Sequence, residues 1–166
     1  MPTWYGGWNN TVSYKNFDLN VFFRFSGGNK IMNASRQSAL FNMDFSNNGT
    51  EILGRWVSPE QPGDGMTPKI GYGDASSLFN DGYTDSHFVE SGNYLKLSTL
   101  ALGYTLPKAV VSKLNMTKIR FYVQGQNLLT ITGYSGLDPE TNSRLGVDWN
   151  GMPQQRSFTF GANITF

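Results

Sequence analysis

The stretch QQRSFTFGANITF, residues 154–166, decides the fold, because residue type follows position more strictly there than elsewhere in the chain. One set of alternate positions holds Phe158, Phe160, Ala162, Ile164 and Phe166, and the other holds Ser157, Thr159, Gly161, Asn163 and Thr165. This period of two residues predicts a β-strand with one apolar face and one small polar face. Half-buried strands of soluble proteins and the strands of transmembrane barrels both show it, so the remaining sequence has to decide between them.

The composition favours strands joined by turns over a compact enzyme. The 166 residues include 19 glycines, aromatic residues make up 14%, and charged residues make up only 15%. A net charge of +1 without a basic run argues against nucleic acid as a partner. Cysteine is absent, which excludes disulfides and thiolate metal sites. No apolar run approaches the roughly 18 residues of a transmembrane helix, so a membrane would have to be crossed by β-strands.

The sequence offers no catalytic constellation, and we predict neither an enzyme nor a cofactor or metal site. His87 is the only histidine, no G-x-S-x-G motif is present, and we expect this side chain to be solvated or packed in a loop. The residues from Asp44 to Gly49 resemble the start of a calcium loop. The twelfth position, however, is Arg55 rather than glutamate, so we interpret them as a polar turn. A soluble β-domain with a binding or hydrolytic function is the alternative.

Four further stretches show a strand-like period, at about residues 4–15, 17–27, 93–106 and 118–132, before the last strand at about 155–166. In the third, the apolar parity changes near Ser98 and Thr99, which predicts a β-bulge. On the polar face of the fourth we place Leu128 together with Arg120 and the glutamines. Only Lys96, beside the bulge, has a charge whose assignment to the polar face is uncertain. Residues 108–115 predict one short helical turn.

The connections between these strands alternate in length. Those after the first and third strands are short, whereas residues 28–92 and 133–154 form long loops, the first with a short helix expected between Ile31 and Phe45. Short turns on one side and long loops on the other are typical of outer-membrane barrels. Five strands are too few to close a barrel, and an open sheet would leave unpaired edges in lipid. The fold class is therefore all-β, with five antiparallel strands belonging to a larger transmembrane barrel.

Four segments resemble, in order and spacing, the C-terminal barrel part of SusC/RagA-type TonB-dependent outer-membrane transporters. They are WYGGWNNTVSYKNFDLNVFFRFSGGNKIMNA (4–34), NYLKLSTLALGYTLPKAVVSKLN (93–115), KIRFYVQGQNLLTITGYSGLDPE (118–140) and PQQRSFTFGANITF (153–166). The resemblance implies a barrel of about 22 strands around a plug that this chain lacks. It also implies import of glycans or peptides in Bacteroidetes-type bacteria, with a SusD-like surface lipoprotein as partner and energy from TonB.

The same resemblance implies a location in the Gram-negative outer membrane, with extracellular long loops and a periplasmic C-terminus. It further implies that Phe166 and its alternating neighbours are the signal read by the barrel-insertion machinery. On physical grounds, we expect Phe158, Phe160, Ile164 and Phe166 to face lipid. Loop aromatics are candidates for contacts with a ligand or the lid, although they could instead pin their own loops. They are Trp56, Tyr72, Phe79, Tyr83, Phe88, Tyr134 and Trp149.

Overall fold

The computed structural model describes residues 1–40, 47–69, 86–140 and 146–166, with the side chains of residues 38–40 left aside. The chain divides into two compact units. The first contains residues 1–29, 92–133 and 153–166, and the second contains residues 30–91 and 134–152. Within the described ranges, no helix has the length and apolar character needed to cross a membrane.

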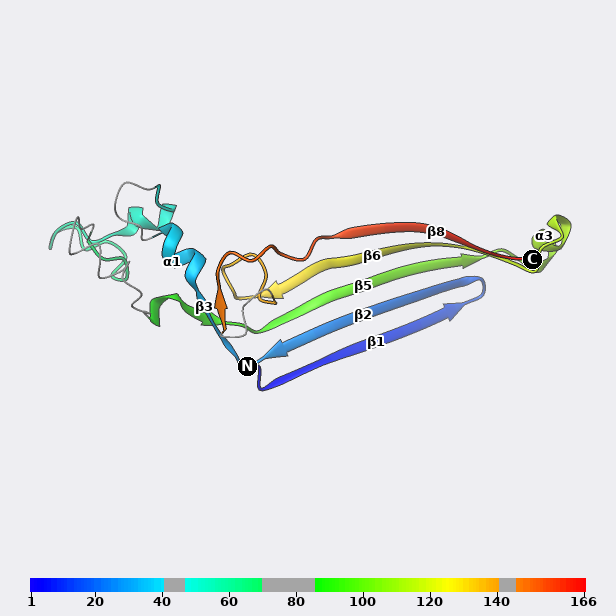
Figure 1. The fold of residues 1–166 in the computed structure, drawn as a ribbon, viewed down its shortest axis with the longest axis horizontal. Helices are drawn as coiled ribbons and strands as arrows, with labels where there is room; N and C mark the ends of the chain where they lie inside the picture. The colour runs from blue at the N-terminus through cyan, green and yellow to red at the C-terminus, as the bar shows by residue number, and fades with distance from the viewer. Residues whose placement is uncertain (41–46, 70–85, 141–145) are drawn as a thin grey trace. The chain divides into compact units, whose positions relative to one another are not determined.

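The first unit is an antiparallel sheet of five strands in the order β1-β2-β5-β6-β8 (Figure 1), which confirms the predicted fold class. The strands are β1 (Trp4–Tyr14), β2 (Phe17–Gly27), β5 (Tyr94–Thr105), β6 (Lys118–Thr132) and β8 (Ser157–Thr165). Each strand pairs with the strand of the same sheet that follows it in the sequence, so β2 pairs with β5 and β6 pairs with β8. The connections after β1 and β5 are short, and the second of them contains the predicted helical turn as α3 (Lys108–Val111) followed by η3 (Ser112–Leu114).

The register of the sheet gives it one apolar and one polar face, because residues opposite one another on adjacent strands share a face. One row across all five strands is entirely apolar and consists of Val12, Leu19, Leu102, Val123 and Phe160. The next row lies on the other face and consists of Thr11, Asn20, Ala101, Gln124 and Thr159. The two-residue period of each strand therefore lines up across the sheet, so that apolar rows lie on one face and polar rows on the other.

A bulge in β5 lies where the sequence predicted it, because in the pairing with β2 the register shifts between Leu97 and Thr99 and leaves Ser98 as the extra residue. In the pairing with β6, Asn127 and Leu128 lie opposite Ser98, so the extra residue there is on β6. Beyond the bulge, Lys96 lies opposite Arg24 and Thr130. Lys96 is therefore on the polar face, so the one charged residue whose face the sequence left undecided is also on that face.

The placement of Leu128 on the polar face is wrong. Asn127 has a left-handed backbone, with φ of 52°, at the irregularity that faces Ser98. The Leu128 side chain lies where a Cβ on Gly125 would be 2.8 Å from its Cδ2 atom, on the apolar side of β6. The bulge thus removes an apolar residue from the polar face.

The second unit contains short strands and helices in the two segments predicted to be long loops. A three-stranded sheet in the order β4-β3-β7 is formed by β4 (Val89–Ser91), β3 (Lys30–Asn33) and β7 (Val147–Asp148). Helices are α1 (Ala34–Leu40), as predicted between Ile31 and Phe45, together with η1 (Thr50–Gly54) and η2 (Ser86–Phe88). Ile31, Ala34, Phe88 and Tyr134 form the buried apolar core of this unit.

Candidate functional site

The apolar face of the sheet exposes large side chains over its whole width. Phe160 is 79% exposed and Phe166 is 85% exposed, and Phe158 and Ile164 are also exposed, near the two ends of β8. Aromatic pairs join neighbouring strands on this face, with ring centroids 4.7 Å apart for Phe17 and Tyr104. Aqueous solvent would make so large an apolar face unfavourable, whereas hydrocarbon would not.

An ion pair on the opposite face bridges three strands. The Nε atom of Arg120 on β6 donates to Oδ1 of Asp18 on β2 at 2.9 Å, and Nη2 donates to Oδ2. Gly103 on β5 lies beneath the pair, and a Cβ at this position would collide with both side chains. A glycine is therefore required here for the bidentate pair to pass over the central strand.

Other polar-face groups are arranged around the bulge. The Nε atom of Arg24 donates to Oγ of Ser98 at 2.9 Å, so the extra residue of β5 provides an acceptor on the charged side of the sheet. Lys96 is only 1% exposed although it is charged. The face that carries these groups is suited to a polar barrel interior, where arginine, lysine and glutamine are readily accommodated.

Arg36 at the start of α1 is the centre of a polar network in the second unit. Its Nε and Nη2 atoms donate to the carboxylate of Glu51 at 2.9–3.2 Å, and Nη1 donates to Oε1 of Glu90 at 3.3 Å. The guanidinium also lies 5.8 Å from the ring centroid of Phe88. Hydrogen bonding to Glu51 raises the pKa of Arg36, and the charges of both glutamates add to this although burial opposes it.

Glu90 connects the two long connecting segments. Its carboxylate accepts hydrogen bonds from the Ser135 backbone N–H and hydroxyl at 2.7 Å each, and from Nδ2 of Asn33 at 3.3 Å. Burial, the largest single influence, would raise the pKa of Glu90. The hydrogen bonds from Ser135 and Asn33, with the charge of Arg36, outweigh burial and hold that pKa below its ordinary value.

Asp148 on β7 fixes the other side of the network. Its carboxylate accepts from the Tyr134 hydroxyl at 2.6 Å and from the Gly151 N–H at 3.2 Å, and its carbonyl accepts from Ser35 at 3.4 Å. Burial, followed by the bond to Asp148, raises the pKa of Tyr134. Asp148 and Tyr134 are therefore anchoring groups of the second unit.

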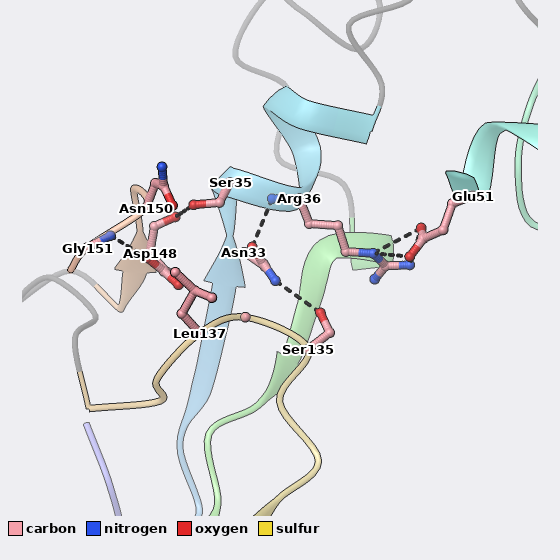
Figure 2. A pocket seen from close by; sticks show the side chains of 10 residues that line it. Asn33, Ser35, Arg36, Glu51, Ser135, Leu137, Asp148, Asn150 and Gly151 are labelled. Atoms are coloured by element: carbon pink, nitrogen blue, oxygen red, sulfur yellow. Dashed lines mark hydrogen bonds and ion pairs between the residues drawn. The ribbon is translucent and has the colours of Figure 1, made fainter. Parts of the chain in front are cut away.

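These side chains surround a cavity of about 300 Å³ (Figure 2). The labelled lining residues are Asn33, Ser35, Arg36, Glu51, Ser135, Leu137, Asp148, Asn150 and Gly151. They come from the end of β3, from α1, from η1 and from residues 134–152, the segment that contains β7 (Figure 2). The cavity offers hydrogen-bond donors and acceptors beside one apolar side chain, Leu137. No cluster of three potential metal ligands occurs among the residues that the structure describes.

The predicted loop aromatics occupy different environments. Phe88 is completely buried and Tyr134 is 6% exposed, so these two lie together in the core of the second unit. Trp149 is 73% exposed. Trp56 is half-buried, with Nζ of Lys69 5.9 Å from its ring centroid. Tyr72, Phe79 and Tyr83 lie outside the described residues, as do residues 44–46 of the stretch resembling a calcium loop.

The polar network itself was not anticipated from the sequence. Asn33 and Ser135, which share a hydrogen bond, are 102 positions apart, and Arg36 is 54 positions from Glu90. No local period or motif connects residues at such separations. The sole signal was the presence of several charged and hydroxyl side chains in otherwise irregular segments.

Comparisons with known proteins agree with the geometry of the sheet. No family model matches the chain. TonB-dependent receptor P3 of Formosa agariphila is 33% identical over 99% of this chain, and TonB-dependent receptor SusC of Bacteroides thetaiotaomicron is 26% identical over 96%. The solved structure of the RagAB peptide transporter superposes on 98% of the chain with a TM-score of 0.83 and 27% identity.

The chain spans only 15–17% of the length of these three proteins. The relatives are named as receptors or as a transporter, not as enzymes. TonB-dependent receptors are outer-membrane proteins, and a five-stranded amphipathic sheet is a segment of such a barrel. Because sequence and fold agree over nearly the whole chain, it belongs to the SusC/RagA family of TonB-dependent outer-membrane receptors.

Proposed function

We propose that the full-length protein imports a nutrient, a glycan or a peptide, across the outer membrane with energy supplied through TonB. The present chain would contribute five strands to the barrel wall and, through its second unit, part of the extracellular surface. The observation that supports this most directly is the sheet itself. Its apolar row of Val12, Leu102 and Phe160 faces one way, and the Asp18–Arg120 ion pair faces the other.

Growth of a deletion strain tests the proposal. We expect loss of growth on at least one defined oligosaccharide or peptide mixture as sole carbon source, restored by the full-length gene but not in a TonB-deficient background. Unchanged growth of the deletion strain on every member of both panels would contradict import. The same assay separates glycan from peptide as the substrate class.

We also propose a SusD-like surface lipoprotein as the partner of the second unit. The pairing named for the RagAB transporter, which superposes on this chain, supports such a partner. Purification of the full-length receptor from solubilised outer membranes would be expected to recover one lipoprotein in equal amount. Recovery of the receptor and plug alone, under conditions that preserve the barrel, would contradict the pairing.

Phe166 is proposed to assist membrane insertion in addition to anchoring the last strand. Its aromatic side chain is 85% exposed and continues the alternation of Phe158, Phe160 and Ile164. Removal of Phe166 from the full-length receptor should reduce the amount of folded barrel in the outer membrane. Substitution of Phe166 by Tyr keeps an aromatic ring and should restore it. Normal assembly after the deletion would leave only the anchoring role.

A role of loop aromatics in ligand or lid contact is proposed chiefly for Trp149 and Trp56. Trp149 presents its ring on the surface of the second unit, and Trp56 presents part of its ring. Phe88 and Tyr134 are buried, so their contribution would be indirect, through the shape of the unit. We expect Trp149→Ala to weaken uptake or lid docking, with Leu53→Ala, another exposed apolar position, as control. Equal uptake and docking in both variants would remove Trp149 from the proposal.

A further inference from the structure

The floor of the cavity in Figure 2 is held in place by its own hydrogen bonds. Asn33 and Asp148 pair across β3 and β7, and both side chains are almost completely buried. Oδ1 of Asn33 accepts from the Arg36 backbone N–H at 2.9 Å, and Nδ2 donates to the Ser135 hydroxyl at 3.1 Å. The Ser35 hydroxyl donates to the Asp148 carbonyl at 3.4 Å. A ligand would therefore enter a site whose floor is already ordered, which lowers the entropic cost of binding.

The rim of the cavity, formed by Asn150, Glu51 and Leu137, is open to solvent. Asn150 is exposed, and within the described part of the chain no hydrogen bond to its side-chain amide is recorded. The Glu51 carboxylate is 42% exposed and accepts from Arg36 alone among the described residues, although a carboxylate has about four acceptor positions. Leu137 is 70% exposed. The rim thus offers an amide, a carboxylate and an apolar side chain to a ligand.

The charges around the cavity disfavour an anionic ligand. The charged lining residues are Arg36, Glu51 and Asp148. The Nε and Nη2 atoms of Arg36 donate to Glu51, and Nη1 donates to Glu90 and to the His87 carbonyl. A carboxylate, phosphate or sulfate would meet two carboxylates, and the one cation of the lining is already bound by two glutamates. Like charges brought together in this way oppose binding, so a neutral ligand fits the cavity better.

The size and the polar groups of the cavity fit one sugar ring. Its volume of about 300 Å³ is at the lower end of the range for small-molecule sites. Each sugar hydroxyl both donates and accepts hydrogen bonds, as the Asn150 amide and the Glu51 carboxylate require, and the C–H face of the ring suits Leu137. A peptide main chain is commonly recognised by addition to a sheet edge. Here β3, whose end contributes Asn33, already pairs on both sides with β4 and β7.

We propose that this cavity binds one neutral sugar ring of the imported substrate. Asn150 and Glu51 bind ring hydroxyls, and Leu137 packs on the C–H face of the ring. The inference rests on the proposed import function and assigns a neutral glycan, rather than a peptide or an acidic glycan, as the substrate class.

Isothermal titration calorimetry on the full-length receptor tests the proposal, in a detergent that has no sugar headgroup. The probes are neutral hexasaccharides of glucose, mannose and xylose, hexagalacturonate as the acidic counterpart, and an end-capped hexapeptide of alanine and serine. We expect at least one neutral hexasaccharide to bind about tenfold more tightly than hexagalacturonate and the hexapeptide.

Two variants locate this binding at the cavity. Asn150 has a left-handed backbone, with φ of 62°, so Asn150→Gly removes the amide and retains a favourable conformation. We expect its affinity for the neutral hexasaccharide to fall about tenfold. Asn115→Gly is the matched control, because Asn115 is also exposed and left-handed, with φ of 54°, but lies in the first unit. Leu137→Ala should lose about threefold, with Leu53→Ala, an exposed leucine outside the lining, as its control.

The absence of binding by every neutral hexasaccharide would overturn the proposal, as would an unchanged affinity in Asn150→Gly or an equal loss in Asn115→Gly. Tighter, Asn150-dependent binding of hexagalacturonate or of the hexapeptide would overturn the assignment to a neutral sugar. An unchanged affinity in Leu137→Ala would exclude packing of the ring on Leu137. Import is tested separately by growth. If sugar binding fails while the deletion strain still loses growth on peptides, the import function stands and the sugar site does not.

Discussion

The two units of this chain place their apolar residues in opposite ways. In the sheet, Phe160 and Trp8 are exposed while Lys96 is buried. In the second unit, Ile31 and Phe88 are completely buried, and charged groups such as Glu51 remain accessible. The difference is what we expect if, as proposed, hydrocarbon contacts the sheet and water surrounds the second unit.

The two units also use polar interactions for different purposes. The Asp18–Arg120 pair connects strands that the backbone ladder already holds in register. In the second unit, Arg36, Glu90 and Ser135 connect segments with little backbone pairing, since β3 and β7 share only two pairs of residues. Side-chain bonds therefore determine the structure of the second unit more than that of the sheet. Each of the following substitutions acts on one side of this contrast.

The largest effect is expected from Phe160→Arg, which places a charge on the face assigned to lipid. Arginine on a lipid face costs about 2–4 kcal/mol at the middle of the bilayer. Thr159→Arg is the matched control, because it adds the same side chain to the adjacent residue on the opposite face. Denaturant unfolding of the full-length barrel in lipid vesicles should show a lower free energy of unfolding for Phe160→Arg but not for Thr159→Arg. Equal losses in both variants would contradict the assignment of the two faces.

A somewhat smaller loss is expected for Gly103→Ala. The added methyl group would collide with Arg120 and Asp18, and overpacking of this kind costs about 1–3 kcal/mol. Gly133→Ala serves as control, because a Cβ there has no neighbour within 4 Å. Unfolding free energies of the two full-length variants, measured in the same vesicles, should differ in that direction. Similar unfolding free energies would show that the Asp18 and Arg120 side chains move away from the added methyl group without destabilising the barrel.

Glu90→Gln should affect the second unit and leave the sheet unchanged. The substitution weakens bonds from Ser135, Asn33 and Arg36, with a cost of about 1–2 kcal/mol. Because the pKa of Glu90 is lowered on folding, its contribution is present above its unfolded pKa and is lost as the pH falls through the folded value.

Hydrogen exchange should therefore show residues 30–37 and 134–140 losing protection in the wild type below about pH 4.5, before β6 does. In Glu90→Gln, part of this protection should already be missing at pH 7. The further decrease in protection on acidification should be smaller than in the wild type. An acid response identical to that of the wild type would contradict the role of Glu90. A simultaneous loss in β6 would show that the two units are not independent in stability.

The smallest effect is expected for Asn127→Ala. A left-handed backbone at a residue with a Cβ costs about 1 kcal/mol, and asparagine tolerates it better than alanine. Asn127→Gly, which accepts this conformation, is the control. Both variants lose the hydrogen bond from the Asn127 side chain to the Gln155 carbonyl, so the glycine variant should be the more stable of the two. The free energy of unfolding of each full-length variant in lipid vesicles is the measurement. Equal stability of the alanine and glycine variants would indicate that the bulge on β6 relaxes.

The strands of the sheet were predictable because a face in contact with one solvent imposes a strict two-residue period over nine to fifteen residues. Phe22 is an apolar residue on the polar face, opposite Asn9 and Thr99, and its position has a local cause. Its ring covers Gly7 on β1, where a Cβ would lie 2.9 Å from Cε2 of the phenylalanine. Leu128 was misplaced because alternation alone does not reveal a left-handed residue at Asn127.

The second unit was much less predictable from the sequence. Strands β4 and β7 have three and two residues, which is too short for any period to appear. The positions of Arg36, Glu90 and Asp148 depend on contacts between segments far apart in the chain, and local propensity contains no information on them. The buried state of Phe88 and Tyr134, in contrast to Trp149, follows from those same contacts.

The parallel pairing of Met32 with Val147 has a consequence for protein engineering. Because β3 lies between β4 and β7, the small sheet is built from both long connecting segments, with β3 and β4 from the first and β7 from the second. Transfer of one segment from a related receptor would leave a strand of the host without its neighbour. Chimeric receptors, and recombination between related genes, should therefore succeed only when residues 30–91 and 134–152 are exchanged together.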